Sequence, residues 1–425
     1  MANKFSLPRG TNDTLPDQAY AWQDLEAKAR QLFKIYGYQE IRTPAFEEIG
    51  LFERSLGQTS DVVQKQMLTL EKDGLALRPE GTAAVVRSYL ENSIDKKQGL
   101  AKLFYIGPMF RGERPQKGRL RQFNQIGVEV IGPNSSHPLF DTEVIALSVH
   151  LLESFGLEGF KLKINSLGTP EDKKKLSALL RERLKKELSH LCEDCQNRFE
   201  RNVFRILDCK NEQCRKVVQK IDLGNAYLSD ESKKYFQAVQ DNLKKMNVSF
   251  EVSPYLVRGL DYYTNTVFEI SHDALGSQNA LGAGGRYNTL LQDLGGAAGL
   301  GGLGFALGVE RILLAKSQNE STIVLPLDVF VVYAKDLKDT NDPVYQSAFQ
   351  LLNLFRQNNI ASDMSYVPCD IGKQMKAAGN KARFAVIIGE DEMKEKAVTL
   401  KDMQARTQEK VAANKVIETL KGKLC

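Results

Sequence analysis

The sequence lacks the features of a membrane or secreted protein. No apolar run approaches the roughly 18 residues that a membrane span needs, and the opening residues, MANKFSLPRGTNDTLPD, contain no apolar stretch of the kind found in a signal peptide. There are only six cysteines in 425 residues, and in such a chain they are better explained as reduced thiols or metal ligands than as disulfides. We therefore expect a cytoplasmic protein with no membrane partner.

Two common phosphate-binding motifs are missing or stand in the wrong context. The sequence has no G-x-x-x-x-G-K-[ST] motif, which excludes a P-loop. GLGGLG at 299–304 fits G-x-G-x-x-G, but the preceding LLQDLGGAA is not a buried strand, so a dinucleotide-binding fold is disfavoured. We favour a glycine-rich strand packed closely over a ligand, followed by a helix in FALGVERILLA.

What remains is the composition of an ordinary globular protein. Hydrophobic residues make up 42% of the chain and charged residues 26%, and the length leaves room for two or three domains. The net charge of +5 is compatible with a polyanionic partner and equally with an enzyme that has none, so it decides little.

Hydrophobic periodicity predicts an α+β protein in which the pattern of helices and strands changes along the chain. Residues 16–36 carry the apolar stripe of an amphipathic helix. LFYIGPMF and QFNQIGVEVIG flank a basic loop and predict an antiparallel hairpin. Residues 168–248 are helix-rich and highly charged, as in an inserted module. Further strands are expected in YGYQEIRTPAF, KLKIN, VSFEVSPYLV and NTVFEIS. After residue 326 strands alternate with three expected helices, at 343–358, 372–382 and 408–422.

The stretch RGERPQKGRLRQFNQIGVEV, residues 111–130, joins a dense run of cations to a strand. Five of its first eleven residues are cationic, and its proline and glycines favour turns. From Arg121 onward the period is two, which places Gln125 and Glu129 on one face. The opposite face is apolar: Ile126, Val128 and Val130. The loop is either a solvated hairpin tip or a grip on a triphosphate, since arginine binds phosphate oxygens bidentately.

Further stretches carry a resemblance to a known family. LRPEGTAA (77–84) sets Glu80 between proline and glycine, and LVRGLDYYTNTVFEI (256–270) sets an arginine, an aspartate and two tyrosines before a strand. GAGGRYNTLL and GFALGVERILL follow. With the basic loop and the opening PRGTNDTLPD, these stretches resemble the class II aminoacyl-tRNA synthetases and, within that class, the histidyl-tRNA synthetase family over nearly the full length.

The resemblance implies a fold and an assembly. A class II catalytic domain on an antiparallel sheet is expected at 1–325, with the helical insertion at 168–248, followed by an α/β anticodon-binding domain at 326–425. GYQEIRTPAFEEIGLFERSLG resembles the first class motif, through which such enzymes form dimers. A homodimer is therefore expected.

The resemblance also assigns roles in the basic loop and beyond it. Arg111 would hold the ATP α-phosphate, and Glu113 would lie at the adenine side. Arg119 and Arg311 would take the outer phosphates. Two residues of the same loop would contact the acceptor end of the tRNA: Gln116 and Arg121.

Arg258 would be the second catalytic cation, opposite Arg111. The attacking carboxylate and the α-phosphate repel each other as they approach, and fixed cations must offset that repulsion. A guanidinium suits this role because it is always charged and can contact both groups. A structural pair between Arg258 and Asp261 is the alternative.

Six residues are implied to bind the amino acid: Glu80, Gln125, Glu129, Arg258, Tyr262 and Tyr263. An imidazole N–H requires a buried acceptor such as Glu129, and an α-ammonium requires oxygens such as those of Glu80 and Gln125. Gly127 would leave room for the substrate on the sheet. Gly112 and Asn124 depart from the family pattern, where histidine is usual; Gly112 could make the loop more mobile, and Asn124 should lie on the opposite face.

The implied activity is the ATP-dependent ligation of L-histidine to tRNA(His) through a histidyl-adenylate, with release of AMP and pyrophosphate and with Mg²⁺ accompanying the ATP. Such chemistry needs no nucleophilic side chain, only positioning and charge stabilisation. Two alternatives stay open: a non-catalytic regulatory subunit of histidine biosynthesis, which typically lacks the C-terminal domain, and an RNA-binding module without ligase activity.

Four cysteines form a separate candidate site. Cys192-x₂-Cys195 and Cys209-x₄-Cys214 are separated by thirteen residues, a spacing compatible with a small zinc site. Four thiolates would leave the metal no open position, so its role would be structural. Reduced structural cysteines are the alternative, and His190 is a weaker substitute ligand.

Overall fold

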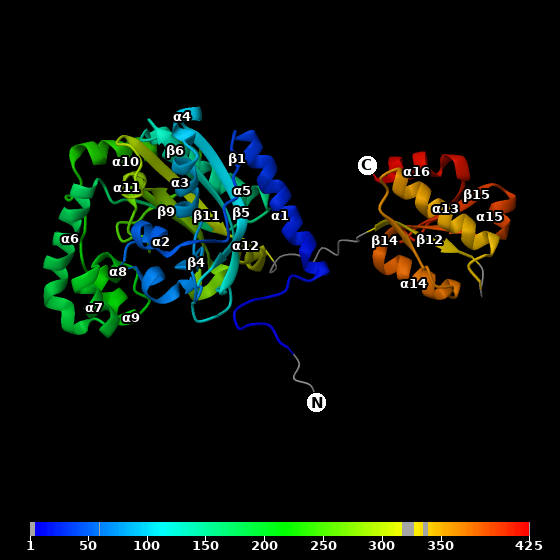
Figure 1. The fold of residues 1–425 in the computed structure, drawn as a ribbon, viewed down its shortest axis with the longest axis horizontal. Helices are drawn as coiled ribbons and strands as arrows, with labels where there is room; N and C mark the ends of the chain where they lie inside the picture. Colours follow the sequence, from blue (N-terminus) through cyan, green and yellow to red (C-terminus); the bar gives the residue numbers. More distant parts are fainter. Residues whose placement is uncertain (1–4, 59, 317–326, 335–338, 425) are drawn as a thin grey trace. The chain divides into compact units, whose positions relative to one another are not determined.

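The computed structural model describes residues 5–58, 60–316, 327–334 and 339–424. The chain divides into two compact units, Met1–Glu320 and Ser321–Cys425 (Figure 1). Each unit has its own sheet and its own buried core.

An eight-stranded sheet forms the centre of the first unit. Across the sheet the strands are β1 (Gln39–Glu40), β5 (Ala101–Phe110), β6 (Gln122–Pro133), β11 (Leu300–Gly308), β10 (Ala280–Arg286), β9 (Thr264–His272), β7 (Phe160–Ser166) and β8 (Glu251–Val252). The pairs are antiparallel except β1 with β5 and β7 with β8, at the two edges. This confirms the expected α+β class, the antiparallel sheet and the β5–β6 hairpin.

The alternation of β6 sends its side chains into two layers. Ile126, Val128 and Val130 are buried with helices on one face of the sheet. These helices are α1 (Pro16–Ile35), α5 (Pro138–Ser154), α10 (Asp230–Lys245) and α12 (Val309–Lys316). The other face is covered by α2 (Ile49–Leu56), α3 (Thr82–Glu91) and α11 (Asn288–Asp293), with a small sheet of β2 (Phe46–Glu48), β4 (Leu75–Leu77) and β3 (Leu68–Thr69). Gln125 and Glu129 point to this second face.

The inserted segment forms a group of helices, drawn in green at the left of Figure 1. They are α6 (Pro170–Leu184), α7 (Glu193–Arg201), α8 (Phe204–Leu207) and α9 (Glu212–Gln219). A capping box between Thr169 and Asp172 starts α6. The later helix α10 packs on α5 and so belongs to the main core.

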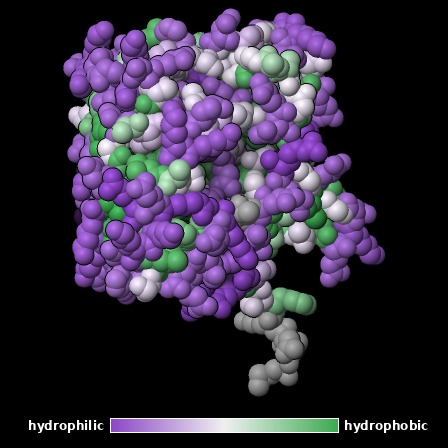
Figure 2. Space-filling view, turned by 90° about the vertical axis from the view of Figure 1, so that its left-hand side faces the viewer, coloured by the Kyte–Doolittle hydropathy of each residue, from purple (hydrophilic) through white to green (hydrophobic). Residues whose placement is uncertain are grey.

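On the side of the first unit shown in Figure 2, hydrophobic residues are scattered among hydrophilic ones.

A five-stranded sheet forms the second unit. Its order is β13 (Ser362–Met364), β12 (Leu327–Tyr333), β14 (Ala382–Ile388), β15 (Ala397–Asp402) and β16 (Gln408–Ala412), with helices α13 (Pro343–Gln357), α14 (Ile371–Lys381), α15 (Glu390–Lys394) and α16 (Val416–Leu424). The helix expected at 408–422 is wrong in its first part. Residues Gln408–Ala412 pair antiparallel with β15, and the helix begins only at Val416.

Other sequence expectations also need correction in the first unit. The helix predicted from FALGVERILLA begins at Val309, because Phe305–Gly308 continue β11 against β6. The strands predicted in YGYQEIRTPAF and VSFEVSPYLV shrink mainly to the two-residue edge strands β1 and β8. Within the described residues, no helix is long and apolar enough to cross a membrane.

Candidate active site

The sheet face beneath α2 and α3 gathers residues from distant parts of the sequence. They come from the end of β4, the β5–β6 loop, β6 itself, the segment before β9, the end of β10 and the start of α12. Polar and charged side chains are buried there, which costs free energy unless each group has a partner. The geometry of these groups therefore shows what the site can hold.

Arg111 directly follows β5 and is the first residue of the β5–β6 loop. Its Nε donates to the carbonyl of Pro79 (2.9 Å), and its guanidinium lies 5.1 Å from the centre of the Phe123 ring. Burial lowers the pKa of Arg111, and the nearby charge of Glu80 partly opposes this effect. A guanidinium fixed in this way is aimed before any ligand arrives.

Two more arginines converge on the same region. Arg311 donates to the carbonyl of Gly118 (2.8 Å), and Arg119 forms an ion pair with buried Glu113. Burial, together with the charges of Arg119 and Arg111, lowers the pKa of Arg311 to about 10. Three like charges close enough to perturb one another favour a polyanion between them, and a triphosphate is such an anion.

Arg258 lies on the segment before β9. Its Nη1 donates to the Glu269 carboxylate (2.7 Å) on β9, while its buried Nε has no hydrogen-bond partner among the described residues. Burial would lower the pKa of Arg258, but the charge of Glu269 raises it overall. The structure thus pairs Arg258 with Glu269, and Asp261 accepts a hydrogen bond from Asn202 (2.7 Å).

The carboxyl group of Glu129 is buried on β6 and lies between two hydroxyl groups. It accepts hydrogen bonds from the Thr82 hydroxyl (2.7 Å) and the Tyr287 hydroxyl. Burial raises the pKa of Glu129 to about 8, although both hydrogen bonds act in the opposite direction. Its charge state is therefore sensitive to pH near neutrality.

Glu80 has a structural role that the sequence did not indicate. Its two carboxylate oxygens accept the backbone N–H groups of Thr82 (2.6 Å) and Ala83 (2.9 Å), so Glu80 caps the first turn of α3. Burial raises its pKa. The Oε1 atom of Gln125 is buried and has no hydrogen-bond partner among the described residues, so it remains available to a ligand donor.

Three tyrosines form an aromatic wall beside Glu129. The rings of Tyr262 and Tyr263 are 4.6 Å apart, and those of Tyr262 and Tyr287 are 5.7 Å apart in an edge-on arrangement. All three are buried. Such a wall suits a planar, partly polar ring.

The expected role of Gly127 was wrong. A Cβ atom at this position would collide with the ring of Tyr105, which lies opposite Gly127 on β5. The space above Gly127 is therefore filled by a tyrosine of the protein itself, and the same ring also lies against Gly81.

The two positions that depart from the family pattern are both held by neighbours. The Gly112 N–H donates to the carbonyl of Gln66 (2.5 Å), which ties the loop to the preceding π-helical turn Val62–Gln66. The backbone and side-chain N–H groups of Asn124 donate to Glu310 of α12 (2.8–3.2 Å). Asn124 therefore points to the face opposite Gln125.

The residues expected at the tRNA are exposed on the loop. The backbone of Gln116 bridges to Arg119, and Arg121 donates from Nε to the carbonyl of Glu113 (3.3 Å). The hydrocarbon part of Arg121 packs against Gly10. The N-terminal stretch therefore lies beside the loop.

Three residues of the site were missed by sequence reasoning: Thr82, Tyr105 and Tyr287. All three stood inside stretches already quoted: Thr82 in LRPEGTAA, Tyr287 in GAGGRYNTLL and Tyr105 in LFYIGPMF. LFYIGPMF indicated only a strand, because the place of Tyr105 in the site depends on the β5–β6 register.

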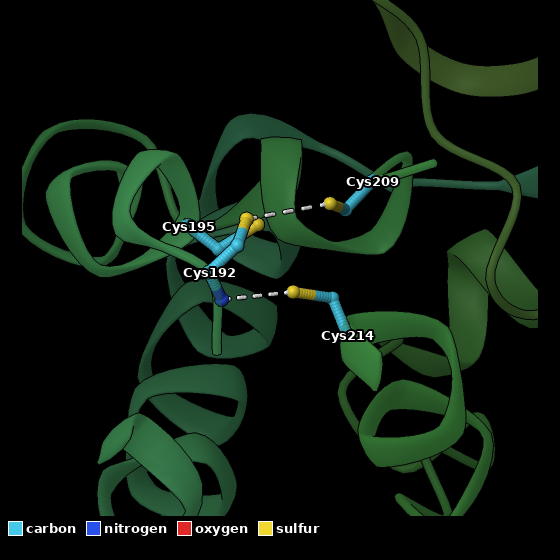
Figure 3. Close-up of side chains that lie close together, drawn as sticks. All are labelled: Cys192, Cys195, Cys209 and Cys214. Atoms are coloured by element: carbon cyan, nitrogen blue, oxygen red, sulfur yellow. Dashed lines mark hydrogen bonds between the residues drawn. The ribbon is translucent and has the colours of Figure 1, made fainter. Parts of the chain in front are cut away.

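The four candidate cysteines converge in the inserted segment (Figure 3). Their sulfur atoms all lie within 4.8 Å of one another, and the Cys192 and Cys209 sulfurs are 3.9 Å apart. The backbone N–H of Cys192 donates to the Cys214 sulfur (3.1 Å). His190 instead pairs with Glu187 (3.1 Å) and is not part of this group.

The antiparallel sheet, the convergent arginines over it and the following α/β unit define a class II aminoacyl-tRNA synthetase. A family model described as histidyl-tRNA synthetase matches residues 10–312, and one described as anticodon binding domain matches residues 328–423. The chain is 43% identical over 420 residues to the histidine–tRNA ligase of Desulforamulus reducens, covering 98% of this chain and 99% of that protein. It is 41% identical over 423 residues to the histidine–tRNA ligase of Clostridioides difficile, covering 98% and 99%. The chain belongs to the histidyl-tRNA synthetase family.

Solved structures agree with this assignment. Apo S. aureus histidyl-tRNA synthetase superposes with a TM-score of 0.77 at 36% identity, covering 98% of this chain and all of that one. A Bacillus halodurans protein described as an ATP phosphoribosyltransferase regulatory subunit/histidyl-tRNA synthetase shares the fold, with a TM-score of 0.65 at 21% identity, covering 92% and 99%. Because the full-length curated relatives are ligases, the regulatory reading is not favoured. Membership in the family makes the chain an ATP-dependent enzyme that attaches histidine to tRNA(His).

Proposed function

We propose that histidine and ATP react on the sheet face beneath α2 and α3, between Arg111 and Arg258. The observation that supports this best is the convergence of Arg111, Arg119 and Arg311, whose charges perturb one another in a largely buried region. ATP, as its Mg²⁺ complex, would place its α-phosphate at Arg111 and its outer phosphates at Arg119 and Arg311.

The histidine side of the site offers complementary partners. The α-ammonium would donate to Glu80 and to the unpartnered Oε1 of Gln125. The imidazole N–H would donate to Glu129, with the ring beside Tyr262 and Tyr263. The bound amino acid then presents its carboxylate to the α-phosphate.

The chemistry needs positioning rather than a protein nucleophile. The substrate carboxylate oxygen attacks the α-phosphorus, the bond to the bridging oxygen breaks, and pyrophosphate leaves with that electron pair. A terminal tRNA hydroxyl then attacks the activated carbonyl and releases AMP. Arg111 and Arg258 offset the charge that accumulates between carboxylate and phosphate.

Histidine-dependent exchange of pyrophosphate into ATP tests the proposal directly. We expect exchange with histidine and none with other amino acids, followed by acylation of tRNA(His). Binding of tRNA without exchange would instead support an RNA-binding module without ligase activity.

Replacing Glu129 by glutamine should impair histidine recognition selectively. An amide is a weaker acceptor than a carboxylate for an imidazole N–H, and loss of one charged hydrogen bond costs about 2 kcal/mol. The KM for histidine should rise about thirtyfold, while the KM for ATP changes little. Glu143→Gln, in a partly exposed pair with Lys102, is the matched control.

The pH dependence of the KM for histidine tests the role of Glu129 a second time. With the pKa of Glu129 near 8, the carboxylate form gains population as pH rises from 7 to about 9. The KM for histidine should therefore fall over that interval in the parent protein. The Glu129→Gln variant reports the titration of the substrate alone. If the KM for ATP rises and that for histidine does not, the assignment is wrong.

We also propose that the four cysteines hold a structural zinc ion. Tetrahedral Zn–S bonds of about 2.3 Å space the sulfurs about 3.8 Å apart, close to the arrangement observed. The N–H of Cys192 directed at the Cys214 sulfur suits a thiolate. With four sulfur ligands there is no open position for catalysis.

Metal analysis checks the zinc proposal. Protein purified without chelator should contain close to one zinc per chain, and it should be lost in Cys209→Ser but kept in Cys369→Ser, which changes a cysteine outside the cluster. Four freely titrating thiols without metal would contradict the proposal.

The remaining proposals concern organisation. The catalytic domain would span 1–325, and within the expected insertion at 168–248 the inserted part would be α6 to α9, since α10 packs in the main core. Residues 326–425 would bind the anticodon, as the matched description of 328–423 suggests. Gln116 and Arg121 would meet the tRNA acceptor end. A cytoplasmic homodimer would use the first class motif, where Phe46 is exposed on β2.

A further inference from the structure

The segment that contains the two cysteine pairs makes side-chain contacts with the rest of the first unit. We call residues 192–214 the knuckle segment. Asn202 donates from Nδ2 to the carboxylate of Asp261 (2.7 Å). Arg198 and Arg205 both donate to the carboxylate of Asp61, at 3.0 and 2.9 Å. These contacts reach two different loops of the activation site.

The first loop carries the histidine-side residues. Asp261 lies between Arg258 and Tyr263 on a segment, residues 253–263, that contains neither helix nor strand. Lys173 of α6 donates to the carbonyls of Asp261 and Tyr263, each at 2.9 Å. A segment without ladder hydrogen bonds depends on such side-chain contacts for its position.

The approach on this side is close. A Cβ atom at Gly259 would lie 2.9 Å from Nη1 of Arg205, and one at Gly57 would lie 2.7 Å from a carboxylate oxygen of Asp261. The Arg205 side chain of the knuckle segment therefore packs on the backbone of the loop before β9, and the Asp261 side chain of that loop packs on the backbone at the end of α2.

The second loop leads to the ATP side. Asp61 immediately precedes the π-helical turn Val62–Gln66, whose last carbonyl accepts the N–H of Gly112 beside Arg111. Burial would raise the pKa of Asp61, but the hydrogen bond from Arg205 and the charges of Arg205 and Arg198 lower it overall. The carboxylate thus holds both arginines of the knuckle segment.

We propose that the knuckle segment, fixed by the metal at its two ends, positions residues 253–263 through the hydrogen bond between Asn202 and Asp261. We call this arrangement the clamp. The inference rests on the proposed zinc site and on activation of histidine at the proposed site. A metal that joins the two cysteine pairs closes the intervening segment into a short loop and restricts it. Asn202 is then a positioning residue: it touches no substrate but holds the backbone that carries Arg258 and Tyr263.

Asn202→Ala tests the clamp through steady-state exchange kinetics. We expect kcat/KM for histidine to fall about tenfold, because small displacements of catalytic groups are costly, while the KM for ATP stays within about twofold. The neighbouring exposed residue provides the matched control, Arg201→Ala, which should behave as the parent.

Exchange of donor and acceptor separates positioning from a general loss of structure. Asn202→Asp alone sets two carboxylates against each other and should be worse than Asn202→Ala. The double variant Asn202→Asp/Asp261→Asn restores an amide–carboxylate pair and should recover most of the loss. Removal of zinc should lower kcat/KM for histidine in the parent and much less in Asn202→Ala, because the two changes break the same link.

Three results would overturn the clamp. Asn202→Ala could show the same kinetics as Arg201→Ala, or it could lose kcat/KM equally for histidine and ATP with a large fall in Tm. The double variant could also fail to recover kcat/KM for histidine. Failure of the proposed function has a different signature, since zinc-loaded parent protein would then show no histidine-dependent exchange at all.

Discussion

Replacing Arg258 by alanine should slow histidyl-adenylate formation by about two to three orders of magnitude, as expected for the loss of one preorganised charge partner. Arg258 is held by Glu269 at 2.7 Å, and its buried Nε has no partner among the described residues. Arg111 is close enough for the two guanidinium charges to perturb each other. In the proposed site, Arg111 alone would then have to offset the repulsion between the carboxylate and the α-phosphate.

Comparison of the two half-reactions makes this test specific. Single-turnover measurements should show activation strongly impaired, whereas transfer from supplied histidyl-adenylate to tRNA should be much less affected. Arg42→Ala removes an exposed arginine paired with Glu40 and is the control for charge alone. Equal damage to both steps, or a large loss of thermal stability, would assign Arg258 a structural role.

The sequence predicted those elements whose signals are local. The β5–β6 hairpin was visible because two alternating runs flank a turn-rich loop. The helical character of residues 168–248 was visible in the same way, and its first helix, α6, starts at a local signal, the capping box of Thr169 and Asp172. In both cases the deciding residues lie within a few positions of one another.

The elements that sequence reasoning missed depend on distant partners. QEKVA has the composition of a helix, yet it becomes β16 because β15 offers it an antiparallel edge. FALG continues β11 because β6 pairs with it as far as Gly308. Pairing between strands overrides local propensity, and one sequence contains no direct record of it.

The same limit applies inside the site. The motifs indicated which stretches meet, but not which atoms share a partner. That Glu129 lies between Thr82 and Tyr287 follows from the packing of α3 on β6 and from Tyr287, after the end of β10, reaching across β11. That Tyr105 covers Gly127 follows from the hairpin register, which a shift of one residue would reverse.

The second large effect, on stability, is expected at a buried ion pair between Arg286 and Asp141. Arg286 ends β10 and Asp141 lies on α5, and their side chains are 0% and 1% exposed. The carboxylate of Asp141 also accepts the Tyr235 hydroxyl of α10 (2.6 Å), and Arg286 donates to the Asn288 side chain (3.2 Å). Burial would lower the pKa of Arg286, but the charge of Asp141 raises it overall. The pair thus joins two helices to the strand that precedes Tyr287.

Asp141→Ala should lower the free energy of unfolding by about 3–5 kcal/mol, because it leaves the Arg286 guanidinium buried without a carboxylate. Urea unfolding can be followed by the fluorescence of Trp22, the only tryptophan, which packs against the core of the first unit. Asp273→Ala breaks an exposed pair with Lys161 and should leave the transition unchanged. The double variant Asp141→Leu/Arg286→Met should recover much of the lost stability, because it removes both charges and refills the space with apolar groups. If Asp141→Ala costs no more than Asp273→Ala, water or another group compensates Arg286, and the pair does not hold β10 against its helices.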